Sequence, residues 1–128
     1  MKFSLSRIVV GFTLVLASLT ALAGEVPFSQ KTFDDLRASG KPVVVHVHAT
    51  WCAVCKKQAE IVDSLAADKP FKDLTVLRAD FDTEKDLLKT LNVAHRSTFV
   101  AFKGSAEVAR SAGDTNPESI AALLAKAL

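Results

Sequence analysis

The 128-residue sequence is poor in the residues that mark several common kinds of site. It contains no tyrosine, one tryptophan and only two cysteines, and its lysines and arginines form no cluster. A chain without a basic patch lacks the electrostatic footprint of a nucleic-acid-binding protein. A structural zinc site usually needs two pairs of Cys or His ligands, and the cysteine pair at 52 and 55 has no second pair to complete it. The sequence disfavours both classes.

The charge of the chain is balanced once its N-terminal stretch is set aside. The formal net charge is +2, from sixteen basic and fourteen acidic residues. Lys2 and Arg7 both lie in the first 23 residues, which contain no acidic residue, so fourteen of each sign remain. The slight excess of positive charge therefore implies nothing about nucleic acid, and we expect no nucleic-acid partner.

The N-terminal stretch has the features of a secretory signal peptide. A positively charged start precedes an apolar, uncharged run over residues 8–23, which ends in the tripeptide Ala-Leu-Ala. We predict a cut after Ala23, giving a signal peptide over residues 1–23 and one domain over residues 24–128. The mature protein would be periplasmic or secreted, without stable membrane association. An uncleaved membrane anchor is the alternative, although the run is short for a spanning helix.

The two cysteines lie where a strand is expected to give way to a helix. Residues 42–48 are apolar and β-branched, which predicts a buried strand of a parallel sheet, and apolar residues recur at helical spacing over 52–67. Free N–H groups and the helix dipole stabilise an anion at a helix start. Cys52 is therefore expected to be exposed and readily deprotonated, with Cys55 more buried and close enough to bridge with it.

Export would also allow a purely structural disulfide between Cys52 and Cys55. That bridge closes a loop of only two residues, and so short a loop stabilises a fold only slightly. The pattern therefore favours a redox-active dithiol over a structural bridge.

The expected strand and the motif that follows it resemble the active-site region of the thioredoxin superfamily. The resemblance extends over residues 30–128. The motif reads Trp51-Cys52-Ala53-Val54-Cys55-Lys56. The resemblance implies an α/β, thioredoxin-like fold with a central mixed β-sheet of four to five strands flanked by helices on both faces. Pattern and turn residues predict a lead-in at 25–28, helices at 29–39, 52–67, 83–91 and 116–126, and strands at 42–48, 74–82, 97–103 and 107–111.

The resemblance implies roles for the residues of this motif. Cys52 would be the nucleophile that forms a mixed disulfide with the substrate, and Cys55 would resolve it. Ala53 and Val54 offer no donor or charge to the thiolate, which favours a reductant or mid-range exchanger over a strong oxidant. Trp51 would shield the site and offer an apolar platform to substrates, or would serve packing alone.

Histidine is the first departure from the family's pattern. His46 stands where relatives have a buried aspartate that exchanges protons with the second cysteine. A histidine can do this and titrates closer to neutral pH. The alternative is a core histidine bonded to a backbone carbonyl. His48 lies on the same face of the strand, at an aromatic position of the family, and is expected to serve packing.

The second departure is Ser97, which stands where the family has a cis-proline facing the two cysteines. A non-proline cis bond costs about 3–4 kcal/mol, yet we expect a cis Arg96–Ser97 bond, as a strained bond at a functional site. Ser97→Pro would then preserve the fold. Ser97 would also bring a hydroxyl to the thiols, and Arg96 would lower the pKa of Cys52.

These residues leave more than one function open. The main hypothesis is a periplasmic thiol–disulfide oxidoreductase with no cofactor besides its Cys52–Cys55 disulfide, acting on protein disulfides or dithiols and served by a membrane or periplasmic redox partner. Loss of the proline ring also unblocks the thiols, so Cys52, Cys55 and His95 could instead bind Cu(I) or zinc in a metal-delivery module. A third hypothesis is a redox-dependent binding protein with little turnover.

Overall fold

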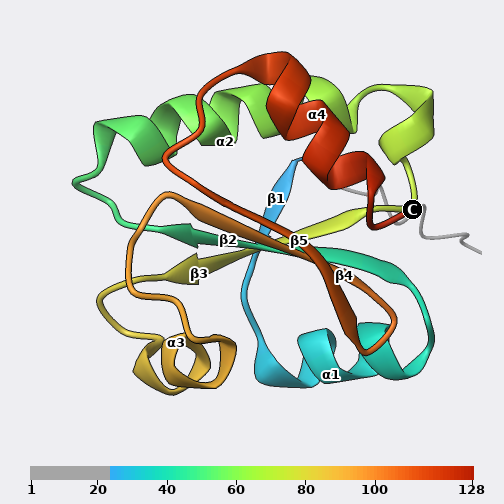
Figure 1. Ribbon diagram of the computed structural model, residues 1–128, viewed down its shortest axis with the longest axis horizontal. Helices are drawn as coiled ribbons and strands as arrows, with labels where there is room; N and C mark the ends of the chain where they lie inside the picture. Colours follow the sequence, from blue (N-terminus) through green and yellow to red (C-terminus); the bar gives the residue numbers. More distant parts are fainter. Residues whose placement is uncertain (1–23) are drawn as a thin grey trace, which may run out of the picture.

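A computed structural model describes residues 24–128, which form a five-stranded sheet with helices on both faces (Figure 1). The strands are β1 (Glu25–Pro27), β2 (Pro42–His48), β3 (Thr75–Asp80), β4 (Thr98–Lys103) and β5 (Ala106–Ala112). The helices are α1 (Gln30–Ala38), α2 (Ala53–Ala66), α3 (Lys85–Leu91) and α4 (Pro117–Ala125), with a short 3-10 helix, η1 (Lys69–Phe71), that was not predicted. The predicted α/β fold with a mixed central sheet is confirmed.

Strand β2 lies at the centre of the sheet, in the order β1-β3-β2-β4-β5, and is almost entirely buried. It pairs in parallel with β3 and antiparallel with β4. A strand covered on both faces can be apolar throughout, which is why its β-branched run could be recognised in the sequence. The register places His46 between Arg78 of β3 and Phe99 of β4.

The sheet separates two hydrophobic cores. Helices α1 and α3 cover one face, and α2 and α4 cover the other (Figure 1). Because successive strand residues point to opposite faces, Val43, Val45 and Val47 join the first core and Val44 joins the second. Each such side chain contributes roughly 1.5–3 kcal/mol by its burial. His46 shares the face of Val44, so its polar ring must find partners beneath α2 and α4.

Local signals set the ends of the elements. Helix α1 begins after Ser29, whose hydroxyl accepts a hydrogen bond from Thr32 N at 3.3 Å, as the sequence predicted. The helix expected from residue 83 begins only at Lys85. The difference arises because Asp80 Oδ1 accepts backbone hydrogen bonds from residues 82 and 83 and so holds them in a turn.

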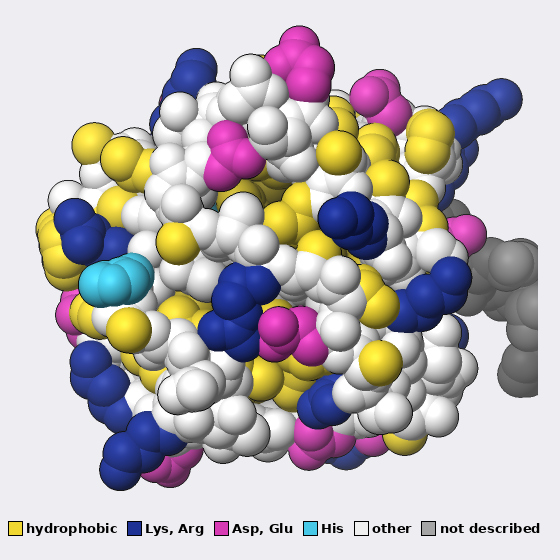
Figure 2. Space-filling view, viewed as in Figure 1, with side chains coloured by type: hydrophobic (Ala, Val, Ile, Leu, Met, Phe, Trp, Pro, Cys, Tyr) yellow, Lys and Arg dark blue, Asp and Glu magenta, His cyan; other side chains and the backbone are white. Residues whose placement is uncertain are grey.

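The exterior of the domain matches its balanced composition. On the face shown in Figure 2, acidic and basic side chains are intermixed. Within residues 24–128, no helix is both long and apolar enough to span a membrane. The predicted signal peptide, residues 1–23, lies outside the described residues.

Candidate active site

The Cys-x-x-Cys lies at the junction of β2 and α2, as predicted. Cys52 is the N-cap of α2, and its Sγ accepts a hydrogen bond from Cys55 N at 3.1 Å. The two residues form a disulfide, with their Cα atoms 5.3 Å apart. On reduction, the same backbone N–H would point at the Cys52 thiolate, and a hydrogen bond to the charged form favours deprotonation.

Cys52 is more enclosed than expected, whereas Cys55 is buried as predicted. Cys55 is fully buried, but Cys52, predicted to be exposed, is only 3% exposed. Ser97 Oγ lies 3.3 Å from each sulfur, and Phe81 packs against the small cluster that Cys52 and Cys55 form with Ala49. The prediction of an exposed Cys52 was wrong because these two covering residues come from distant parts of the chain. Cys52 nevertheless remains the more accessible member of the pair.

The conformation at Ser97 also differs from the expectation. Its hydroxyl does reach the sulfurs, as predicted, but the expected cis bond is wrong: residues 24–128 contain no cis peptide bond. Ser97 instead has φ of 62°, in the left-handed region. A single left-handed residue costs about 1–2 kcal/mol, less than the roughly 3–4 kcal/mol of a non-proline cis bond. The left-handed conformation of Ser97 is therefore the less costly of the two ways to make this turn.

Three hydrogen bonds to the backbone of Ser97 hold this conformation in place. Ser97 N donates to Val47 O at 2.8 Å, which ties the residue to β2. The Ser97 carbonyl accepts from Gly113 N at 2.8 Å and from the Gln58 side chain at 3.0 Å. Ser97 is thus fixed by β2, α2 and the segment before α4, and its hydroxyl has little freedom to leave the sulfurs.

The exposed rim of the site is apolar and aromatic. Trp51 is 59% exposed and Val54 is 40% exposed. The Trp51 indole N–H donates to Asp82 Oδ2 at 2.9 Å, and the Arg96 guanidinium lies 4.7 Å from the centre of the indole ring. Arg96 thus has a cation–π contact with Trp51, and its expected effect on the pKa of Cys52 stays a prediction. The exposed members of the motif also include Ala53 and Lys56.

The three-ligand metal hypothesis finds no support in the geometry. His95 is exposed in the loop before β4. Among residues 24–128, no group of three His, Cys, Asp or Glu side chains is placed to hold a metal ion. With Cys52 and Cys55 joined in a disulfide, the structure gives no support to a site formed by Cys52, Cys55 and His95.

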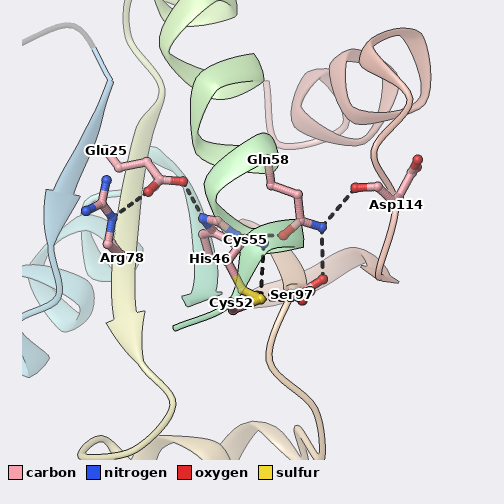
Figure 3. A network of polar contacts seen from close by, with 8 residues as sticks. All are labelled: Glu25, His46, Cys52, Cys55, Gln58, Arg78, Ser97 and Asp114. Atoms are coloured by element: carbon pink, nitrogen blue, oxygen red, sulfur yellow. Dashed lines mark hydrogen bonds and ion pairs between the residues drawn. A yellow bond between two sulfur atoms is a disulfide. The ribbon is translucent and has the colours of Figure 1, made fainter. Parts of the chain in front are cut away.

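His46 is buried in a chain of polar contacts that begins at the edge of the sheet (Figure 3). Arg78 Nε donates to Glu25 Oε2 at 2.7 Å, and the other oxygen of Glu25 contacts His46 Nδ1. His46 Nε2 lies 2.9 Å from Gln58 Oε1. Gln58 Nε2 then donates to the carbonyls of Ser97, at 3.0 Å, and Asp114, at 2.9 Å.

These contacts revise the view of His46 taken from the sequence. Its ring stacks on Phe99 with centroids 4.4 Å apart, and both nitrogens meet side chains rather than a backbone carbonyl. The proposed proton exchange with Cys55 stays a prediction. His48 packs edge-on against His46 at 5.7 Å, in line with its expected packing role.

Sequence reasoning missed Glu25 and Gln58. Gln58 had a readable signal, because it shares a helical face with Cys55 and Val62 and is a polar residue on the buried side of α2. Glu25 had none: β1 is only three residues long, too short to show an alternating pattern. Its partner His46 is also 21 residues away in the chain.

The network sets the charge state of its members. Burial alone would raise the pKa of Glu25, but the hydrogen bonds and charges of His46 and Arg78 outweigh burial and leave that pKa below its ordinary value. For His48, burial and the charges of His46 and Arg78 lower the pKa. Glu25 is therefore an anion and His48 neutral near pH 7.

Comparison with known proteins places this geometry in a family. The family model described as thioredoxin matches residues 25–126. The chain belongs to the thioredoxin family. A thioredoxin of Chlamydia muridarum is 35% identical over 98 residues, covering 77% of this chain and 93% of that protein. Thioredoxins are thiol–disulfide oxidoreductases, and with its Cys-x-x-Cys pair this chain is one as well.

Solved structures of similar proteins agree with the fold. The crystal structure of Trxlp from Edwardsiella tarda matches with a TM-score of 0.74 and 39% identity, covering 77% of this chain and 95% of that one. Thioredoxin from Trypanosoma brucei brucei matches with a TM-score of 0.71 at 19% identity, covering 83% and 92%, and shows the shared fold alone.

Proposed function

We propose that this protein is an exported thiol–disulfide oxidoreductase. Cys52 attacks the substrate disulfide, and Cys55 resolves the mixed disulfide that forms. The observation that carries the proposal is the N-cap position of Cys52, where both Cys55 N–H and the Ser97 hydroxyl reach its sulfur. Two donors at one sulfur favour the thiolate, which is the attacking species. The same Ser97 hydroxyl also lies 3.3 Å from Cys55 Sγ, but its one proton can serve only one sulfur at a time. Cys55 is fully buried, which suits the second step.

The proposed exchange balances in two steps. The Cys52 thiolate attacks one sulfur of the substrate disulfide, forming a mixed disulfide and releasing a substrate thiolate. Cys55 then loses its proton and attacks Cys52 Sγ, which breaks the mixed disulfide and releases the second substrate sulfur. The proton from Cys55 and one proton from solvent protonate the two substrate sulfurs, which become thiols. The two electrons that reduce the substrate come from the Cys52–Cys55 dithiol.

The rim around the disulfide supports protein substrates. Exposed Trp51 and Val54 form an apolar surface beside buried sulfurs, so a substrate has to press a segment against this rim to reach Cys52. A second protein must then reduce the Cys52–Cys55 disulfide again. Because the predicted signal peptide implies export, we place that partner in the periplasm or its membrane, and the substrates among periplasmic or secreted proteins.

Two linked measurements test the proposal. The purified protein is expected to accelerate the reduction of insulin by dithiothreitol well above the uncatalysed rate. When residues 1–128 are expressed in a bacterium, the protein is expected in the periplasmic fraction. Its mass should equal that of a chain starting at Gly24. Insulin binding without turnover would favour the redox-dependent binding protein instead. A cytoplasmic protein that retains residue 1 would contradict the export proposal while leaving the chemistry intact.

A further inference from the structure

The proton positions along the buried chain follow from its hydrogen-bond partners. Gln58 Nε2 faces two carbonyl oxygens, those of Ser97 and Asp114, so this end of the amide must be the donor. Its Oε1 therefore faces His46 Nε2 at 2.9 Å. An amide oxygen can only accept, so His46 Nε2 carries a hydrogen.

The other nitrogen of His46 also faces an acceptor. Nδ1 contacts a carboxylate oxygen of Glu25, whose side chain is fully buried and whose second oxygen accepts from Arg78 Nε at 2.7 Å. A guanidinium on one oxygen favours the ionised carboxylate, in agreement with the lowered pKa of Glu25. An ionised Glu25 leaves the proton of this contact on His46.

We propose that Glu25 is a positioning residue that holds His46 protonated on both ring nitrogens, so that a cation stabilises the Cys52 thiolate of the reduced enzyme. The inference rests on the proposed role of Cys52. His46 is one side chain, Gln58, away from Ser97, which touches both sulfurs. Arg78 and Glu25 offset each other at the far end of the chain, so the uncompensated positive charge lies on His46, the member nearer to the sulfurs.

Among residues 24–128, no acidic side chain other than Glu25 is in contact with His46. On β2, His48 is held neutral by its lowered pKa. On β4 the neighbour is the uncharged ring of Phe99. On β3, Asp80 lies opposite His48 in the strand register. Its Oδ1 accepts the backbone hydrogen bonds of the turn that follows the strand.

Charged residues further along the neighbouring elements are engaged elsewhere. On α2, Asp63 lies beside Gly24 at the start of β1, and the two cysteines are bonded to each other. A pocket of about 280 Å³ is lined by Glu25, Pro27, His48, Thr50, Arg78 and Asp80. The pocket therefore lies at the Glu25 end of the chain of contacts, and neither cysteine lines it.

The assignment has a chemical consequence for the enzyme. A cation that stabilises the Cys52 thiolate also stabilises the reduced dithiol, and a stabilised reduced form makes the pair a weaker reductant. Ala53 and Val54, the two uncharged residues between the cysteines, favour a reductant or an exchanger of intermediate reduction potential. The buried network therefore shifts the expected behaviour of the pair towards the mid-range.

The test combines NMR with a thiolate titration. Heteronuclear NMR of the histidine ring nitrogens is expected to show both nitrogens of His46 protonated at neutral pH. In Glu25→Gln, His46 should lose one proton, and the midpoint of Cys52 thiolate formation, followed by ultraviolet absorbance, should rise by about one pH unit. Alkylation at mildly acid pH should slow by about tenfold, since the thiolate fraction falls in proportion.

The sign of the shift separates this proposal from simple charge removal. Deleting an anion near a thiol by itself favours the thiolate and lowers the midpoint. The control Asp80→Asn, which keeps the Oδ1 acceptor of its turn, is therefore expected to lower the midpoint slightly or leave it unchanged. A single proton on His46 in the wild type, or an unchanged or lowered midpoint in Glu25→Gln, would overturn the proposal.

The measurements keep two possible failures apart. If Glu25→Gln does not fold, the His46 spectrum of the wild-type protein still decides. If Cys52 proves not to be the nucleophile, alkylation labels Cys55 instead, while the protonation of His46 is unaffected.

Discussion

Cys52→Ser is expected to lower the rate of insulin reduction by about 10³-fold or more, because a serine hydroxyl cannot replace the thiolate as nucleophile. Cys55→Ser is expected to lose turnover as well but to keep the first attack, since Cys52 and its hydrogen-bond donors remain. That variant should therefore accumulate a mixed disulfide with the substrate. Non-reducing gels and mass spectrometry of the trapped adduct provide the measurement.

The two serine variants control for each other, since each replaces one sulfur by oxygen within the same turn of α2. Trapping by Cys52→Ser and none by Cys55→Ser would reverse the assignment of the two roles. Full activity in Cys52→Ser would exclude the disulfide chemistry proposed for the pair.

Ser97→Pro is expected to destabilise the oxidised protein by about 3 kcal/mol. The proline ring fixes φ near −65°, whereas Ser97 has φ of 62°. The substitution also removes the N–H that donates to Val47 O at 2.8 Å. The midpoint of urea denaturation should fall accordingly, and the loop that covers the sulfurs should be displaced.

Ser97→Ala is the matched control for this change. It keeps the backbone N–H and removes only the hydroxyl, so its loss should stay at about 1 kcal/mol or less. A Ser97→Pro variant as stable as the parent would show that residue 97 readily adopts the cis geometry expected from the family, and would contradict the left-handed conformation. The sequence alone led to that opposite expectation.

Features fixed by neighbours in the chain could be predicted from the sequence. The limits of β2 follow from a continuous β-branched run, and the start of α2 follows from helical spacing after Cys52. The same local pattern located both members of the Cys-x-x-Cys pair. These predictions needed no knowledge of how distant segments meet.

Features that depend on distant segments could not be predicted in this way. Cys52 is buried by Ser97, which is 45 residues away in the chain. The acid beside His46 comes from β1, where one short edge strand happens to pair with β3. The handedness of Ser97 depends on three hydrogen bonds to separate elements, and the family's cis-proline suggested a different solution to the same turn.

The most direct test of the account is to find which thiol reacts first. Reduced protein is treated with less than one equivalent of an alkylating reagent at neutral pH, and the labelled peptide is located by mass spectrometry. Cys52 is expected to carry nearly all of the label, because it has the two donors and the greater exposure. Preferential labelling of Cys55 would contradict the assignment of nucleophile and resolving thiol.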